Sequence, residues 1–254
     1  MLKREWQVFL LGISIFTRLP IPVSVPYSET RKNESYKYCG LVGLIIGGMT
    51  ALVYSAALTL WSTEISVVIS MAFSVYITGA FHEDGFADTC DGFGGGFTTE
   101  RKLEIMKDSR IGAYALLATV LILLLKYSAL LSLLNVPTAL VLAHILSRSM
   151  AVSFIYTHGY VRQAEQSKLK VSKSSSSQGD FITIMLIGMA ACLLIQDIST
   201  TIMMIAMLLI ARVFISRWII KQIGGYTGDV LGAIQQLTEV LCYLILLAKV
   251  STKV

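Results

Sequence analysis

Residues 39–61 read CGLVGLIIGGMTALVYSAALTLW, a run of 23 residues without a charged side chain. A helix of about 20 apolar residues is long enough to cross the hydrocarbon core of a bilayer. The rest of the chain has the same character, since 55% of its 254 residues are hydrophobic and 15% are charged. Soluble domains rarely combine so apolar a composition with so few charges. We therefore expect an integral membrane protein built of helices.

Six further apolar segments bring the number of expected spans to about seven. They are 65–81, 113–134, 138–156, 181–195, 198–220 and 230–248, of which 181–195 is the shortest. Residues 5–18 are apolar but too short to cross, and two nearby prolines end that segment. We expect an N-terminal interfacial or re-entrant helix there. The predicted fold is all-α, a polytopic helical bundle that forms a single membrane-embedded domain over residues 1–254.

The basic residues predict how this bundle is oriented. Lys and Arg gather before the first span and in the loops after the second, fourth and sixth spans. The loops 62–64, 135–137 and 196–197 contain neither. By the positive-inside rule, the basic loops face the cytoplasm. The net charge of +5 is then a consequence of topology, so we expect membrane lipids as neighbours and no nucleic acid as a partner. The loop after the fourth span, 160–180, is interpreted as a solvated loop or a basic flap over an anionic ligand.

An acidic stretch follows the second span and reads HEDGFADTCDGFGGG over residues 82–96. In a helix, Asp84, Asp88 and Asp91 would share one face, being spaced i, i+4 and i+7. Carboxylates crowded in this way either have raised pKa values or hold a cation between them. Their hard oxygen atoms suit Mg²⁺, Mn²⁺ or Ca²⁺. A solvated acidic turn between two helices is the alternative. Ionisable groups next to an apolar span favour a functional role.

Several arginines and a second acid are further candidates. Asp108 could join a metal site and Arg110 could hold a phosphate through its planar fork, although the two would also make an ordinary surface ion pair. Arg18 is either a phosphate contact or a snorkelling helix end. Arg148 lies within the fourth span, where a buried guanidinium needs an anion, and His144 on the same face is more often a packing residue.

The start of the seventh span reads GGYTGDVLGA over residues 224–233. Gly225, Thr227 and Gly228 precede a helix whose free N–H groups can cradle an anion. Asp229 is either the N-cap of that helix or a metal ligand. Because this segment and the acidic stretch open on the same membrane face, we expect the start of the seventh span to pack beside the end of the second. Polar side chains further along, among them Glu239, should face the protein interior.

These motifs together resemble the cobalamin synthase family, the adenosylcobinamide-GDP ribazoletransferases. The resemblance runs nearly end to end. It is carried by FTRLP at 16–20, LVG at 41–43, HEDGFADTCDG at 82–92, LEIMKDSRIG at 103–112, SR at 147–148 and TGDVLGA at 227–233 with Glu239. The resemblance implies transfer of phosphocobinamide from adenosylcobinamide-GDP to α-ribazole or its 5′-phosphate, with release of GMP. It also implies a bacterial or archaeal inner membrane, with the active site facing the cytoplasm.

The resemblance and the residues together predict the roles of individual side chains. Metal binding, by one or two Mg²⁺ ions with Mn²⁺ as a substitute, is assigned to Asp84, Asp88, Asp91 and Asp229. Glu83 is the candidate general base, with Asp108 and Arg110 as further catalytic residues. Substrate binding is assigned to Arg18, Arg148, Gly225, Thr227 and Gly228. The sequence leaves a homo-oligomer open.

Two other classes of protein are alternatives. A lipid phosphotransferase acting on CDP-alcohols would use a similar carboxylate cluster, but its usual Asp-Gly-x-x-Ala-Arg core is broken here at residues 85–88. A transporter could use the acids as an ion site, although transporter sites tend to lie at the membrane midplane. Release of GMP would distinguish the ribazoletransferase from both.

Overall fold

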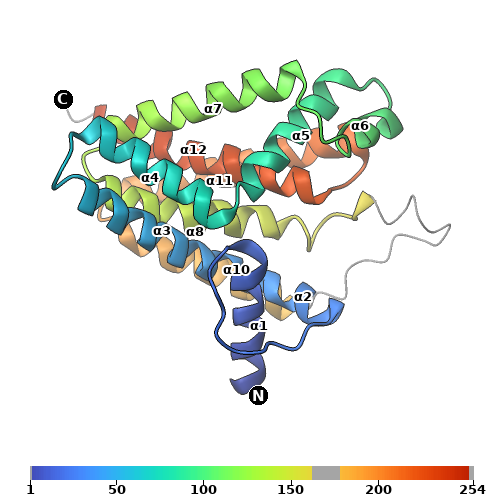
Figure 1. Cartoon of the computed structure of the whole chain (residues 1–254), viewed down its shortest axis with the longest axis horizontal. Coiled ribbons are helices and arrows are strands. Elements are labelled where there is room, and N and C mark those ends of the chain that lie inside the picture. Colours follow the sequence, from blue (N-terminus) through green and yellow to red (C-terminus); the bar gives the residue numbers. More distant parts are fainter. Residues whose placement is uncertain (1, 162–177, 252–254) are drawn as a thin grey trace.

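The computed structural model describes residues 2–161 and 178–251, and over these residues the chain is a bundle of helices (Figure 1). The basic loop predicted around 162–177 lies outside the described residues. The α-helices are α1 Leu2–Phe16, α2 Glu29–Ser35, α3 Cys39–Ala57, α4 Thr63–Thr78, α5 Phe81–Gly95, α6 Thr99–Ile105, α7 Ala113–Leu131, α8 Val136–Ser153, α10 Gln178–Ala191, α11 Ile198–Ile223 and α12 Gly228–Ser251.

Each of the seven predicted spans contains a helix, and the all-α polytopic bundle is confirmed. Within the described ranges, five helices are long and apolar enough to cross a membrane by themselves. The helices α4 and α5 reach that length only as a pair bent by 87°, which brings the number to six. The predicted fifth span corresponds to Gln178–Leu194, an apolar helix shorter than the other five. Length and composition therefore support five or six spans, one or two fewer than expected.

The core of the bundle is built around α8. Its membrane-length window is 83% buried, whereas the corresponding window of α11 is only 11% buried and lies at the edge. Glycines bring α3 close to α8, because a Cβ added to Gly43 would collide with the backbone carbonyl of His144. A Cβ on Gly47 would lie 2.8 Å from Cα of Val141. Small residues at such positions are the usual means by which membrane helices approach closely.

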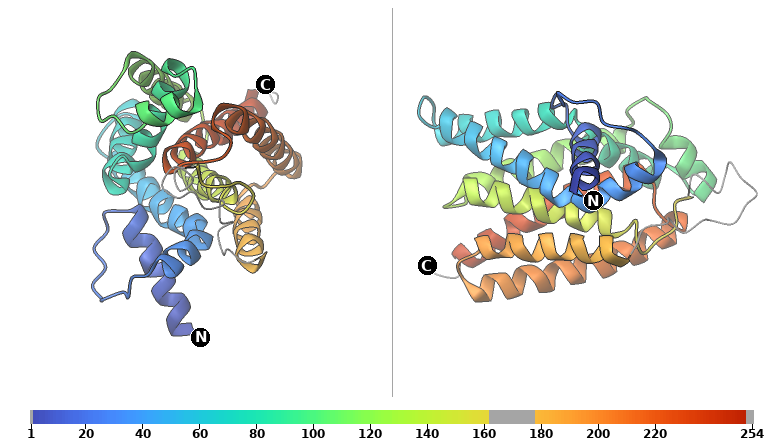
Figure 2. Two further views of the ribbon diagram at one scale, coloured as in Figure 1. Left: turned by 90° about the vertical axis from the view of Figure 1, so that its right-hand side faces the viewer. Right: turned by 90° about the horizontal axis from the view of Figure 1, so that it is seen from below.

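The two ends of the bundle carry different loops. The turns that join α3 to α4 and α7 to α8 lie at one end with the C-terminus (Figure 1). The α5–α6–α7 segment and the start of α12 lie at the opposite end, which is the end of the basic loops. The long helices run alongside one another and α1 crosses them (Figure 2), as expected of an interfacial helix. The acidic stretch and the glycine-rich turn thus share one end, as predicted.

The second span ends three residues earlier than predicted, at Thr78 instead of Phe81. Gly79 and Ala80 follow with φ of +69° and +60°, and these two left-handed residues turn the chain into α5. Glycine adopts this conformation without strain, whereas alanine does so at a cost of roughly 1–2 kcal/mol. The acids therefore do not prolong the second helix. They lie on a separate helix.

Candidate active site

The acidic stretch forms helix α5, so the three aspartates occupy the helical register that the sequence predicted. Their surroundings differ, however. Asp84 is exposed, Asp88 is half-buried and Asp91 is buried. Because the three carboxylates differ in exposure, they cannot be treated as one equivalent set.

The start of α12 packs directly on α5, as the sequence predicted. A Cβ added to Gly85 would lie 2.9 Å from both Cα and the carbonyl oxygen of Asp229. A Cβ on Gly232 would lie 3.0 Å from the carbonyl of His82. Gly85 is next to Asp84 and one turn from Asp88, so the Asp229 backbone lies beside the turn that bears these two carboxylates. Two glycines therefore allow segments about 140 residues apart in the sequence to pack closely.

The Asp91 side chain, on α5, caps the N-terminus of α7, whose own N-cap residue is Gly112. Its Oδ2 accepts a hydrogen bond from the backbone N–H of Gly112 at 2.6 Å, and its Oδ1 accepts one from Ala115 at 2.9 Å. A carboxylate at a helix N-terminus satisfies orphan N–H groups and interacts favourably with the helix dipole. Asp91 thus has a structural role that its spacing with the other aspartates did not reveal.

Asp108 and Arg110 form an ion pair in the exposed loop between α6 and α7. The guanidinium Nε of Arg110 lies 3.0 Å from each carboxylate oxygen of Asp108. These hydrogen bonds lower the pKa of Asp108 to about 2. Both residues line an open cleft of about 460 Å³ together with Asp91 and Tyr114. The structure therefore brings three of the predicted site residues to one solvent-accessible cleft, with Arg110 itself 88% exposed.

The glycine-rich turn before α12 is closely packed. A Cβ on Gly225 would collide with the carbonyl of Gly159, and the Tyr226 N–H donates a hydrogen bond to that carbonyl at 2.9 Å. The buried hydroxyl of Thr227 accepts a hydrogen bond from the Val230 N–H at 3.2 Å and so caps α12. The alternative in which Asp229 is the N-cap is wrong, because Thr227 occupies that position. Gly228 follows as the first helical residue.

Arg18 lies against the turn between α4 and α5. Its backbone N–H donates a hydrogen bond to the carbonyl of Ile77 at 2.7 Å. A Cβ on Gly79 would lie 2.6 Å from the Arg18 Nε, so the side chain covers this glycine. Arg18 is exposed, and its guanidinium is therefore held close to the first turn of α5, where a phosphate contact was predicted.

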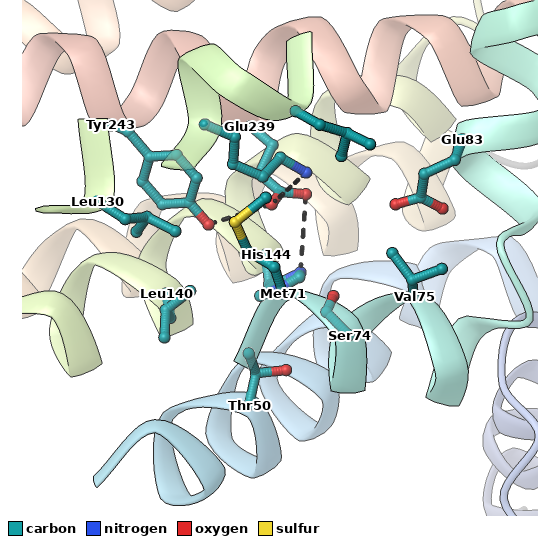
Figure 3. Close-up of a pocket in the computed structure, with 12 residues that line it drawn as sticks. Thr50, Met71, Ser74, Val75, Glu83, Leu130, Leu140, His144, Glu239 and Tyr243 are labelled. Atoms are coloured by element: carbon teal, nitrogen blue, oxygen red, sulfur yellow. Dashed lines mark hydrogen bonds and ion pairs between the residues drawn. The ribbon is translucent and has the colours of Figure 1, made fainter. Parts of the chain in front are cut away.

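A polar network fills the bundle below α5 (Figure 3). The Lys126 ammonium lies 3.0 Å from Glu239 Oε1 and donates a hydrogen bond to Gln236 Oε1 at 2.9 Å. Gln236 Nε2 in turn donates one to Glu83 Oε1 at 2.9 Å. Glu239 also accepts hydrogen bonds from Gln235 and Tyr243. Lys126 was not predicted to be a site residue, although a single charged side chain within an apolar span often marks a functional group.

Glu83 points into this network and a small cavity at its centre (Figure 3). Its Oε2 is buried and has no hydrogen-bond partner among the described residues. The cavity, about 10 Å³ in volume, also contacts Thr50, whose buried hydroxyl oxygen likewise has no partner there. A space of this size holds about one water molecule. The predicted base is thus oriented by Gln236 and retains one unpaired carboxylate oxygen.

Arg148 is also buried, with 2% of its surface exposed. Its Nη1 lies 2.7 Å from Nδ1 of His144 and 3.2 Å from the His144 carbonyl. It lines a second cavity of about 90 Å³ to which Gly228 contributes. Arg148 and Gly228, both predicted to bind substrate, are therefore brought together.

The carboxylates suit a metal ion that is shared with a substrate. In the described part of the chain, no group of three or more His, Cys, Asp or Glu side chains is close enough to hold a metal ion by itself. Mg²⁺ is usually held by one or two carboxylates together with water and substrate phosphates. Asp84 and Asp88, one turn apart on an accessible helix, provide such a pair. The metal-site assignment stays a prediction.

Comparison with known proteins gives a consistent result. The family model for cobalamin-5-phosphate synthase matches residues 8–247. An adenosylcobinamide-GDP ribazoletransferase from Shewanella amazonensis is 45% identical over 250 residues, covering 96% of each chain. The protein of the same description from Vibrio cholerae is 46% identical over 97% of this chain and 95% of its own, and that from Vibrio parahaemolyticus is 42% identical over 97% and 94%. No solved structure matches.

Proposed function

The chain belongs to the cobalamin-5-phosphate synthase family, and we propose that it catalyses the last joining step of the cobamide nucleotide loop. It transfers the phosphocobinamide group of adenosylcobinamide-GDP to α-ribazole or its 5′-phosphate. A hydroxyl of the acceptor attacks the phosphorus attached to cobinamide, and the bond to GMP breaks. The products are adenosylcobalamin, or its 5′-phosphate, and GMP.

The observation that carries this proposal is the extent of the match to the relatives. It covers nearly the whole of both chains. The matched range 8–247 includes the acidic helix α5, the loop with Asp108 and the start of α12. A chain that shared only apolar spans with the family would match by composition, whereas this one also matches in the segments between the spans.

The reaction is proposed to depend on Mg²⁺ held by Asp84 and Asp88 with Asp229. When bound, Mg²⁺ neutralises charge on the two phosphates and stabilises the GMP leaving group. The support for this site is the accessible carboxylate pair on α5 and the close packing of Asp229 beside it. Asp91 would contribute its remaining lone pairs, since each of its oxygens already accepts one N–H.

Other side chains would bind the substrates and move the proton. Glu83 is proposed to take the proton of the attacking hydroxyl. Arg18 and Arg110 are proposed to bind phosphate, because both are exposed, Arg18 against Gly79 just before α5 and Arg110 in the cleft that Asp91 lines. For Arg110 this means exchanging its ion pair with Asp108 for a phosphate, and such exposed pairs cost little to break.

The test is an assay with purified protein in lipid nanodiscs. Adenosylcobinamide-GDP is incubated with α-ribazole or α-ribazole 5′-phosphate, and corrinoid and nucleotide products are separated by chromatography. We expect GMP and the joined corrinoid in equal amounts, no product in EDTA, and recovery with Mg²⁺ or Mn²⁺. GMP without a new corrinoid would indicate a hydrolase instead. Absence of both products with all additions present would refute the proposed function.

A further inference from the structure

The 90 Å³ cavity lies where several helices end or begin. Phe16 ends α1, Phe81 begins α5 and Gly228 begins α12, while Val152 belongs to the last turn of α8. The acidic helix α5 thus begins at this cavity. Phe81 is three residues from Asp84, so a molecule in this cavity would be within one helical turn of the proposed reaction site.

The walls of the cavity are mainly apolar and aromatic. The ring of Phe16 lies 6.2 Å from that of Phe81 and 6.0 Å from that of Tyr36. Val152, Ile155 and Leu231 complete much of the remaining surface. Such a lining favours a flat apolar group, since aromatic rings pack well edge to face or offset against one another.

The Arg148 guanidinium has a donor without a hydrogen-bond partner in this apolar setting. Its Nη1 is engaged with His144, but its Nε is buried and has no hydrogen-bond partner in the described structure. A buried donor left unpaired is costly, so an acceptor supplied by a ligand would be bound favourably. His144 already presents an imidazole nitrogen to the same guanidinium at 2.7 Å. An sp² ring nitrogen is thus an acceptor that this side chain accommodates.

The charges nearby indicate that the missing acceptor is neutral. Arg148 and Lys126 are the two cations of the buried network, and Glu239 and Glu83 are its two carboxylates. His144 lies between Arg148 and Glu239, with its Nδ1 3.9 Å from the carboxylate. The formal charges of the network sum to zero, so the cavity does not require an anion. A phosphate would bring excess negative charge into this balanced network.

We propose that this cavity binds the aromatic base of the acceptor nucleoside, with Arg148 donating a hydrogen bond to a ring nitrogen. The proposal rests on the proposed function, which makes α-ribazole, a benzimidazole nucleoside, the acceptor. The cavity has a volume of about 90 Å³, nine times that of the cavity beside Glu83. The assignment gives Arg148 a ring nitrogen as its partner in place of the phosphate suggested by the sequence.

Binding of α-ribazole to the purified full chain in nanodiscs tests this site without turnover. Equilibrium dialysis measures the Kd of α-ribazole in the absence of adenosylcobinamide-GDP, with benzimidazole or inorganic phosphate as competitor. We expect benzimidazole to compete and phosphate not to compete. Val152→Phe fills the cavity and should raise the Kd by about 10-fold or more. Val120→Phe, on the exposed face of α7, is the matched control and should leave the Kd unchanged.

A second variant covers the case in which Val152→Phe does not fold. Val152→Ala enlarges the cavity, so it should improve binding of a nucleoside whose base carries one more fused ring, relative to α-ribazole. The inference is overturned if phosphate competes and benzimidazole does not, or if neither Val152 variant changes α-ribazole binding. Wild-type protein that binds α-ribazole in this way but releases no GMP would refute the proposed function and leave the base site standing.

Discussion

Replacing Asp91 by Asn separates the structural role of this residue from a role in metal binding. The Asp91 carboxylate accepts hydrogen bonds from the N–H groups of Gly112 and Ala115. An Asn side chain has one acceptor oxygen, so one of these N–H groups would face an amide NH₂ and stay unpaired. Both residues are buried, since Ala115 is 2% exposed and Asp91 is 9% exposed.

The size of the effect follows from two losses. An unpaired buried donor costs about 1–3 kcal/mol. Loss of the negative charge at the N-terminus of α7 costs about 0.3–1 kcal/mol more. A total of about 1–4 kcal/mol corresponds to a drop in Tm of roughly 3–15 °C for a chain of this size. We also expect turnover to fall by about 10²-fold, because the cleft that Asp91 lines would be disturbed.

The assay is thermal unfolding of the detergent-purified protein, followed by circular dichroism, in parallel with the GMP-release assay. Asp84→Asn is the matched control, since Asp84 is exposed. It should lose turnover to a similar extent and unfold within about 1 °C of wild type, because surface changes are usually nearly neutral. An Asp91→Asn protein with wild-type Tm and lost turnover would refute the capping argument and return Asp91 to the metal site.

Three further results are expected. Lys126→Met should destabilise the protein by about 3–5 kcal/mol in denaturant unfolding, because the buried Glu239 carboxylate loses its ion-pair partner. Adding Glu239→Gln should recover most of that loss, and a double variant no more stable than the single one would contradict this. In turnover assays, Asp88→Ala and Asp229→Ala combined should cost much less than the sum of the single effects if both serve one metal site, and additive losses would count against it. In a cysteine-free background, Phe97→Cys, 97% exposed in the loop before α6, should react with a membrane-impermeant thiol reagent only from the cytoplasmic side, and labelling from outside would reverse the orientation.

The sequence by itself determined the class of the protein and the arrangement of its ends. Uncharged runs of bilayer length predicted the helices, and the distribution of Lys and Arg predicted which loops lie together. The acidic stretch and the start of α12 both lie at the end of the bundle that carries the basic loops, so the sequence also predicted their contact. The motifs that resemble the family lie in these same segments, and the match to the family model covers them.

The tertiary structure decided how individual polar groups are used. Glu83 meets Gln236 across 153 residues, and Asp91 caps a helix that begins more than 20 residues later. Periodicity predicts which face of a helix a side chain shares, but not which neighbouring helix that face meets. The turn at Gly79 and Ala80 depends on a left-handed backbone that alanine does not favour, and Arg18 packs over it from another element. Hydrogen-bond partners, helix caps and cavities depend on how the helices cross and rotate against one another. Contacts between residues far apart in the sequence set this geometry, and these contacts cannot be read from the order of residues along the chain.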